Sequence, residues 1–507
     1  MTHYQFQNKI WRRAHHTGFA TLEIILALSI IISALATVLL VSSGNQNILA
    51  DSSTEHVALL VAEQLLHTTR ADASTDFKLL VATSSTTSTF TTAVSENTDD
   101  FFVTRATATV SWKNILGQSR HVSLTSILAD TDSAESGETC EPDPDGDWSH
   151  PHVVNSTTDV ANLIGDSTST YTITDINAYK QHLYITANAD TKTKPTFFIF
   201  NITDPTHPTL QTKIDTATTS QIGPAALAIA SSSTHSFAYI ASASSFAKGQ
   251  LQIIDLATST PYVMTTYKID PTVVATAGVG NSIFYSHGLI YLGLTGTTNP
   301  EFHIIDVHDP LHPQLLGSYF IGSAINAISV VGAYAYIVHP KNTSFDEQLT
   351  ILNVSDPTHP FRIGGFSSPS GIGGNGKHIY TVAHTIYLGK TASNISGNAD
   401  TIPEFYTLDT TQPSSLTTIG SFPLTTTGES IDRILVRNSL LYLLTNKELL
   451  IKKISPDTPW TATPFAILAL PGVGSITEPS MDCEGNYVYV GSNNTADKGY
   501  LSVIESQ

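Results

Sequence analysis

The sequence contains little cysteine and little charge. Its 507 residues include two cysteines, Cys140 and Cys483, and 13% of the residues are Asp, Glu, Lys or Arg. Two cysteines without a nearby histidine pair do not supply the four ligands of a structural zinc site. A low charge content together with abundant serine and threonine is typical of a secreted surface protein.

Basic residues are few, and the common catalytic motifs are absent. Asp and Glu number 43 against 24 Lys and Arg, which gives a formal net charge of −19. So acidic a chain repels a phosphate backbone, which argues against a nucleic acid partner. The sequence has no Gly-x-Ser-x-Gly elbow, no His-Glu-x-x-His pair and no Gly-rich phosphate loop. We therefore expect no catalytic residue, cofactor or metal, and we predict that the protein is not an enzyme.

One long apolar run near the N-terminus contains a single acid. Residues 18–41 begin Gly-Phe-Ala-Thr-Leu-Glu and continue without another charge. A helix rises about 1.5 Å per residue, so residues 19–41 can cross the roughly 30 Å of a bilayer's hydrocarbon core. An acid such as Glu23 inside a membrane span is costly, and its default interpretation is functional. A general secretory signal would be cut after the apolar run, whereas here the small residue Gly18 precedes it.

The first 23 residues resemble a type IV prepilin. A polar leader with three basic residues precedes Gly18, and Glu23 is the fifth residue after it. The resemblance implies that a prepilin peptidase cuts after Gly18, that the new N-terminal Phe19 is methylated, and that Glu23 pairs with the terminal amine of a neighbouring pilin subunit. It also implies storage in the inner membrane before assembly. The alternative is a plain signal anchor in which Glu23 snorkels to the membrane surface.

Apolar residues at helical spacing continue beyond this run as far as Arg70. We therefore expect residues 1–18 to be the leader and residues 19–72 to form one transmembrane and assembly helix. A Ser/Thr-rich stretch at residues 84–92 interrupts the pattern.

Residues 73–129 are predicted to form a small antiparallel sheet. Apolar and polar residues alternate at 105–112 and again at 122–126, with Gly117 in a turn between them. A period of two marks half-buried strands. A long helix followed by such a sheet resembles a minor pilin, and an unrelated hairpin stalk is the alternative.

Residues 130–148 are acidic and lose the apolar period, which predicts a linker. Asp143, Asp145 and Asp147 alternate with Pro and Gly, which faintly resembles a calcium loop. The bidentate Glu of such a loop is missing at its required offset, so we expect no calcium site.

The rest of the chain repeats itself seven times. Each repeat has a tyrosine flanked by apolar residues and then a second apolar run. The tyrosines are Tyr184, Tyr239, Tyr291, Tyr336, Tyr380, Tyr442 and Tyr489, and the runs are Phe197–Ile199, Leu251–Ile254, Phe302–Ile305, Leu349–Leu352, Phe405–Leu408, Leu449–Ile451 and Leu501–Ile504. The tyrosines are 55, 52, 45, 44, 62 and 47 residues apart, close to the roughly 40 to 50 residues per blade of propellers. We therefore predict a mainly β fold: a seven-bladed β-propeller over residues 149–507, preceded by a long N-terminal α-helix and a small pilin-like antiparallel sheet.

Most repeats carry an Asp and a Pro-bounded turn after the second run. The clearest are Asp-Pro-x-His-Pro at residues 204–208, 309–313 and 356–360. Asp caps its own turn, and proline fixes φ and donates no ladder bond, so the strand ends there. With the run Phe302–Val307 ahead of the second motif, these stretches resemble LVIVD repeats, a family that forms β-propellers. The resemblance extends from about residue 148 to the end and is weak in the fifth and sixth repeats.

Three histidines share one position in these turns: His207, His312 and His359. They belong to different blades and are too far apart to converge on a metal ion. We therefore interpret them as turn residues.

A ring of blades must close, because an open blade exposes a strand edge. The seventh repeat ends at its third strand, so its outer strand must come from elsewhere. We expect residues 150–156 to supply it, with Val153 and Val154 beside the Leu501–Ile504 strand. This arrangement would bring Cys140 and Cys483 to one face of the seventh blade. A disulfide between them is the expectation, and two unpaired cysteines are the alternative.

These features predict a minor pilin or pseudopilin-like surface protein that displays a propeller as a binding module for an extracellular protein or glycan. The body is expected outside the cytoplasm, at the cell surface or on a pilus, held by one N-terminal helix. The alternatives are a membrane-tethered extracytoplasmic enzyme and a structural spacer. Acidic or histidine side chains converging in the central funnel would favour the enzyme. The longest loop, at about residues 384–403, is either functional or a tolerated insertion.

Overall fold

The structure is a computed structural model of the whole chain. It describes residues 25–33, 48–75, 83–87, 90–100, 103–114, 117–129, 139–140, 146–154, 158–191, 194–216, 223–231, 236–242, 249–269, 278–296, 299–341, 347–368, 374–382, 384–392, 402–424, 428–437, 440–454, 464–470, 479–494, 496 and 498–507. The chain divides into two compact units, residues 1–130 and 131–507.

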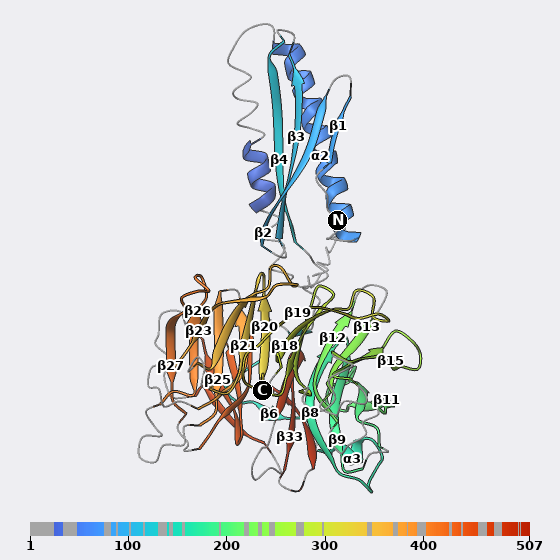
Figure 1. The fold of residues 1–507 in the computed structure, drawn as a ribbon, viewed down its shortest axis with the longest axis vertical. Helices are drawn as coiled ribbons and strands as arrows, with labels where there is room; N and C mark the ends of the chain where they lie inside the picture. The colour runs from blue at the N-terminus through green and yellow to red at the C-terminus, as the bar shows by residue number, and fades with distance from the viewer. Residues whose placement is uncertain are drawn as a thin grey trace, which may run out of the picture. The chain divides into compact units, whose positions relative to one another are not determined.

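The first unit packs a helix on an antiparallel sheet. The sheet has the order β1 (Thr83–Thr86), β2 (Thr91–Asp100), β3 (Val103–Lys113) and β4 (Ser119–Ala129). Helix α2 (Ile48–Thr75) lies along this sheet and contacts β3 and β4 (Figure 1). Ala58, Ala62 and Leu66 recur every four residues, so they form one helix face, and they are buried against the sheet together with Trp112. A turn at Gly117, whose φ is 74°, joins β3 to β4, as the sequence predicts.

The helix of the first unit differs from its prediction. Residues 25–33 are helical and α2 begins at Ile48, but residues 19–24 and 34–47 lie outside the described residues. No described helix runs unbroken over residues 19–72. Gly44 and the neighbouring Ser and Asn residues have low helix propensity, and the prediction gave more weight to the apolar spacing on either side of them. Within the described part of the chain, no single helix reaches the combination of length and hydropathy that a membrane crossing requires.

The Ser/Thr-rich stretch at residues 84–92 also takes part in the sheet. It supplies most of β1 and the beginning of β2. Threonine is β-branched and fits an extended strand well, so a Thr-rich stretch is as compatible with a strand as with a loop.

The second unit consists of sheets with a repeated pattern. Six four-stranded antiparallel sheets and one six-stranded sheet are described in it. The first strands of these sheets are β8 (Tyr171–Tyr179), β12 (Pro224–Ser231), β16 (Gly280–Ser286), β20 (Ala327–Val331), β24 (Gly376–Val382), β28 (Ile431–Arg437) and β32 (Ser480–Gly485). The second strands are β9 (His182–Ala189), β13 (Ser236–Ser242), β17 (Leu289–Leu294), β21 (Tyr334–Val338), β25 (Thr385–Lys390), β29 (Leu440–Thr445) and β33 (Tyr487–Asn493).

The third and fourth strands complete each meander. The third strands are β10 (Phe197–Asn201), β14 (Leu251–Asp255), β18 (Phe302–Asp306), β22 (Leu349–Asn353), β26 (Phe405–Asp409), β30 (Glu448–Lys453) and β34 (Gly499–Glu505). The fourth strands are β11 (Thr209–Ile214), β15 (Tyr262–Tyr267), β19 (Gln314–Tyr319), β23 (Phe361–Phe366), β27 (Thr417–Phe422) and β31 (Ala466–Ala469). All seven apolar runs singled out in the sequence lie on third strands.

The first strands form a closed circle. Each lies beside the first strand of the following sheet, and β32 lies beside β8, which joins the last sheet to the first. Apolar side chains fill the space between neighbouring sheets. Between the first and last sheets, for example, Tyr171 and Phe198 pack with Leu501 and Val503 in one buried cluster. The core of this unit is therefore a series of layers between sheets.

Residues from before the first repeat complete the last sheet. β6 (His152–Val153) pairs antiparallel with β34, with Val153 opposite Ile504, and the Val154 N–H donates to the Val503 carbonyl at 2.9 Å. The sequence pattern predicts this position for Val153 and Val154. The short strand β7 (Thr158–Asp159) also pairs with β34, and helix α3 (Val160–Leu163) follows it.

A second segment of the linker pairs with the opposite edge of the same sheet. β5 (Thr139–Cys140) runs parallel to β32, with Cys140 opposite Gly485. The sheet order is β5-β32-β33-β34-β6. Residues 139–153 therefore reach both edges of the last sheet, although residues 130–148 were predicted to be only a linker.

The position predicted for the second strand of the fifth repeat is wrong. Six of the seven tyrosines lie on second strands, but Tyr380 lies on the first strand β24, and Tyr387 occupies the second-strand position. Both tyrosines follow an isoleucine in an apolar stretch, so the pattern fits either one. With Tyr387, the neighbouring steps of 44 and 62 residues become 51 and 55. The long loop is shorter for the same reason: residues 385–390 form β25, and residues 393–401 lie outside the described residues.

Trp148 anchors the segment that completes the last sheet, and its removal tests that anchoring. The indole is 2% exposed and packs edge-on against Tyr442, with ring centroids 5.1 Å apart. We expect Trp148→Ala to lower the free energy of unfolding by about 3–5 kcal/mol, because a large buried ring leaves a cavity. Urea unfolding followed by circular dichroism measures this loss. His150→Ala, an exposed neighbour, should change it by no more than about 0.5 kcal/mol; equal losses in the two variants would contradict the anchoring role.

Candidate functional site

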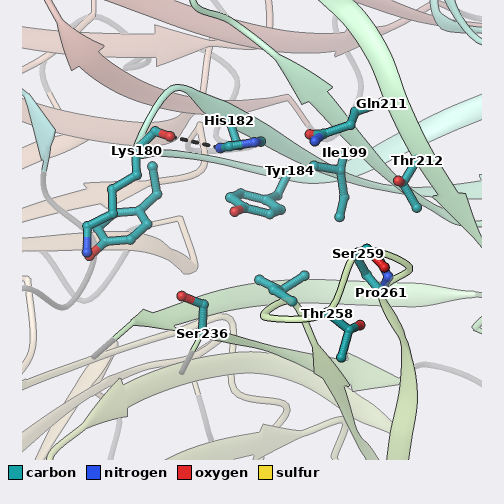
Figure 2. A pocket seen from close by; sticks show the side chains of 12 residues that line it. Lys180, His182, Tyr184, Ile199, Gln211, Thr212, Ser236, Thr258, Ser259 and Pro261 are labelled. Atoms are coloured by element: carbon teal, nitrogen blue, oxygen red, sulfur yellow. Dashed lines mark hydrogen bonds between the residues drawn. The ribbon is translucent and has the colours of Figure 1, made fainter. Parts of the chain in front are cut away.

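A pocket lies between the first two sheets of the second unit (Figure 2). Its volume is about 360 Å³, within the roughly 300–1,000 Å³ of small-molecule sites. One wall comes from the β8–β9 turn and from β9, β10 and β11, and the other comes from the start of β13 and the β14–β15 turn. The lining residues are Tyr179, Lys180, His182, Tyr184, Ile199, Gln211, Thr212, Ser236, Leu256, Thr258, Ser259 and Pro261.

The β8–β9 turn at the edge of the pocket has an uncommon backbone. Lys180 and Gln181 have φ values of 48° and 62°, which suits the two-residue turn of a tight hairpin. The Nδ1 atom of His182 donates to the Lys180 carbonyl at 2.8 Å, because a carbonyl only accepts. Figure 2 shows this bond beside the ring of Tyr184. The turn thus fixes the orientation of the imidazole that lines the pocket.

Two tyrosines form the aromatic part of the first wall. Tyr184 is 6% exposed and stacks on Phe197, with centroids 6.2 Å apart and planes 16° apart. Burial, with Tyr179 and Glu484 nearby, raises the pKa of Tyr184, so its hydroxyl is a hydrogen-bond donor at neutral pH. Tyr179 is 4% exposed, and its hydroxyl has no hydrogen-bond partner among the described residues.

The second wall is a polar turn. Asp255 Oδ1 accepts the Ala257 N–H at 2.8 Å, and Thr258 Oγ1 donates to the Thr260 carbonyl at 3.0 Å. These bonds hold the β14–β15 turn in place, and the turn lies across the pocket from Tyr184 (Figure 2). The pocket therefore offers rings on one side and hydroxyl groups on the other.

Acidic side chains on the circle of first strands accept hydrogen bonds from the backbone of a neighbouring sheet. Asp175 Oδ2 accepts the Leu227 N–H at 2.9 Å, and Asp482 Oδ2 accepts the Ala178 N–H at 2.7 Å. Burial raises the pKa of Asp175, and Arg433, 3.9 Å away, and backbone N–H bonds act against the increase. These carboxylates join adjacent first strands.

His378 plays a similar part on β24. Its Nδ1 accepts the Ile434 N–H at 3.2 Å from the following sheet. Burial, together with the charges of Arg433 and Lys377, lowers the pKa of His378 well below its ordinary value, so the ring is neutral and can accept. Acidic and histidine side chains do gather on the circle, as an enzyme would require, but these three are engaged in holding sheets together.

The Asp-Pro-x-His-Pro turns share one geometry. In the turn of Asp356, Oδ1 accepts the Thr358 N–H at 2.9 Å, and Oδ2 lies 3.0 Å from His359 Nδ1. The same His–Asp contact is 3.1 Å for His207 with Asp204 and 2.8 Å for His312 with Asp309. Each histidine therefore contacts the aspartate of its own turn.

A fourth copy of this turn precedes β6, and the sequence analysis did not recognise Asp147 as its first residue. Asp147 Oδ1 accepts the Ser149 N–H at 2.9 Å, and Oδ2 lies 3.0 Å from His150 Nδ1. Asp-Trp-Ser-His-Pro has no proline at its second position, which concealed the match. Both carboxylate oxygens of Asp147 serve the turn, while Asp143 and Asp145 lie outside the described residues. No group of three or more His, Cys, Asp or Glu able to hold a metal occurs in the part of the chain that the structure describes.

The site residues expected from the sequence are not among the described residues that line the pocket. Gly18, Phe19 and Glu23 are outside the described residues. Cys140 lies on β5, and Cys483 is fully buried on the paired strand β32. The pocket residues form no recognisable sequence motif, because they come from two repeats and meet only when the sheets pack together. The one local signal was the pair Lys-Gln between Tyr179 and His182, a turn between two apolar stretches.

Comparisons with known proteins agree with a repeated β fold. Residues 322–367 match the LVIVD repeat, and this segment contains the whole sheet of β20 to β23. The resemblance to LVIVD repeats is thus confirmed for this segment. No curated protein matches the chain.

Similar solved structures include Hsv2 of Kluyveromyces lactis, with 9% identity, a TM-score of 0.42 and coverage of 66% of this chain and 99% of that one. The WD40 domain of Neurospora crassa Pan2 has 10% identity, a TM-score of 0.44 and coverage of 71% and 96%. Neither likeness assigns a ligand or a partner to this chain.

The aspartates of the repeated turns should make stability depend on acid pH. Hydrogen bonds from Thr206, His312 and Thr358 lower the pKa values of Asp204, Asp309 and Asp356, respectively. The folded state then binds fewer protons than the unfolded state, so this stabilisation is present above about pH 4 and is lost as the pH falls through the folded pKa values.

A triple Asp→Asn variant at positions 204, 309 and 356 tests this dependence. Asn keeps the Oδ1 acceptor of the turn but does not titrate. We expect the variant to lose part of the decline of the thermal midpoint between about pH 4 and pH 2, measured by circular dichroism. Asp215→Asn, outside these turns, should keep the wild-type decline. Parallel curves for wild type and triple variant would show that the turns do not contribute.

Proposed function

We propose that this chain is a minor pilin or pseudopilin-like surface protein that displays a seven-bladed β-propeller as a binding module. The proposal has two parts, the module and its display. The module is supported by the repeated four-stranded meanders and by the closed circle of first strands. The display is supported by the resemblance of the first 23 residues to a prepilin and by the helix-on-sheet fold of the first unit.

The polar groups of the second unit fall into two sets, and this difference is the observation that supports a binding function. Asp175, His378 and Asp482 on the central circle accept backbone N–H groups and so are committed to structure. The pocket between the first two sheets, in contrast, offers hydroxyl, amide and aromatic groups around an open volume. Groups arranged in this way suit recognition of a ligand better than chemistry on it. The expected absence of enzymatic activity remains part of the proposal.

Display requires an anchor, and residues 25–33 are consistent with one. Ile25, Leu28, Ile31 and Ile32 of this helical stretch are all more than half exposed. This exposed apolar surface must be buried in an apolar environment. The inner membrane supplies it before assembly, and neighbouring pilin subunits supply it afterwards. In this proposal a prepilin peptidase cuts after Gly18, and the body lies outside the cytoplasm, where it meets an extracellular protein or glycan.

A disulfide between Cys140 and Cys483 belongs to the same proposal. The pairing of β5 with β32 places residue 140 two residues away from the partner position of Cys483. No described cysteine is free. An extracytoplasmic body permits such a bond. It would tie the linker to the ring beside the point where β6 completes the last sheet.

Glu23→Ala tests display. We expect the variant to enter the membrane and to be processed, because the apolar run and Gly18 are unchanged. Incorporation into filaments should fall at least tenfold, because the acid no longer pairs with a neighbour's terminal amine. Immunogold labelling of intact cells and blotting of sheared filaments measure it.

Glu55→Ala, a change on α2 outside the apolar run, is the matched control and should assemble as wild type. Sequencing of the native N-terminus gives a separate reading, which should begin at Phe19. A native chain beginning at Met1, or equal assembly of Glu23→Ala and wild type, would contradict the display proposal.

The disulfide is tested by alkylation and unfolding. Intact mass should show two alkyl groups on denatured protein only after reduction. Cys140→Ser should lower the free energy of unfolding by about 2–5 kcal/mol, the usual effect of removing a native disulfide. The substitution leaves buried Cys483 in place, so a packing defect does not contribute. Reduced wild type should match the variant, and alkylation without reductant would mean that the two thiols are unpaired.

A further inference from the structure

The two walls of the pocket offer complementary chemistry (Figure 2). On one side lie the rings of His182 and Tyr184, 6.1 Å apart and inclined by 30°, with Ile199 beside them. On the other side lie the hydroxyl groups of Thr258 and Ser259. A ligand that fills this space must present an apolar face to the rings and hydrogen-bonding groups to the turn.

The hydroxyl of Tyr179 adds a second, independent indication of a ligand. This side chain is 4% exposed and lines the pocket, yet its hydroxyl has no partner among the described residues. Buried hydroxyls in native structures are nearly always hydrogen-bonded, so a buried hydroxyl without a described partner needs an explanation. A ligand oxygen that reaches this group provides one.

Charge narrows the chemistry of the ligand. The chain carries a formal net charge of −19, which disfavours polyanions. Lys180, the one lysine that lines the pocket, lies with its Nζ 5.0 Å from the centroid of the Tyr179 ring, where a cation–π contact holds it. The remaining polar groups that line the pocket are neutral hydroxyls and an amide, together with the His182 imidazole.

We infer that this pocket binds a neutral saccharide of one or two rings, an assignment of ligand that rests on the proposed binding function. Each sugar hydroxyl both donates and accepts, so it can pair with the Ser259 hydroxyl and can donate to Thr258 Oγ1, whose own proton goes to the Thr260 carbonyl. The C–H face of a pyranose is apolar and packs on an aromatic ring such as that of Tyr184. The volume of about 360 Å³ leaves no room for a longer peptide segment.

Titration of the full-length protein with neutral disaccharides tests the inference. Lactose, cellobiose and chitobiose are the probes, with digalacturonate as the charged counterpart, and isothermal titration measures binding. We expect at least one neutral probe to bind. The double variant T258A/S259A should weaken that binding at least tenfold, because two hydrogen-bonding groups are lost from an exposed turn that the bond between Asp255 and the Ala257 N–H still holds. Tyr184→Phe, which keeps the ring and its packing, should weaken it less.

The matched control is S414A/S415A, two exposed serines in the equivalent turn of the fifth sheet, which should bind as wild type. Binding of digalacturonate alone, no binding of any neutral probe, or equal affinity in T258A/S259A and wild type would overturn the saccharide assignment. Surface display is measured separately, because cells that carry the T258A/S259A variant should still be labelled by immunogold at their surface. Loss of sugar binding with retained labelling therefore leaves the display proposal standing.

Discussion

The second unit depends on the pairing of β6 with β34. A row of sheets that does not close leaves a strand edge exposed at each end. Here the last repeat supplies only three strands, and Val153 takes the fourth position opposite Ile504. Few backbone hydrogen bonds join two such distant parts of the chain, so side-chain packing must add to them. Trp148, which packs against Tyr442 of the preceding sheet, supplies part of that packing.

The segment that contains β6 also carries a copy of the turn found in the repeats. Asp147 begins an Asp-x-x-His-Pro turn ahead of β6, just as Asp356 begins one ahead of β23. In both places the turn reverses the chain into an outer strand, and the carboxylate caps the N–H groups that the reversal leaves unpaired. The chain that precedes the ring is therefore a displaced piece of the seventh repeat. It begins with this turn and not with the strand.

Much of this architecture could be predicted from local sequence, and the errors have local causes. The third strands carry apolar runs on both faces, so every run was found. The fifth repeat was misplaced because Tyr380 and Tyr387 both stand in apolar stretches and only pairing distinguishes them. The pocket could not be foreseen, since Tyr184 and Thr258 belong to different repeats and meet only when two sheets pack. The bonds of Asp175 and His378 across sheets are long-range in the same sense.

The polar groups of the ring follow from its geometry. First strands lie side by side on the circle, and the side chain of Asp175 there is only 18% exposed, so its charge needs a partner. Asp175 and Asp482 find one in the backbone of the next sheet. Away from the circle, on the turn between β14 and β15, the side chain of Thr258 is exposed to solvent. Polar side chains near the axis therefore hold neighbouring sheets together, and those on the outer turns are left exposed to solvent.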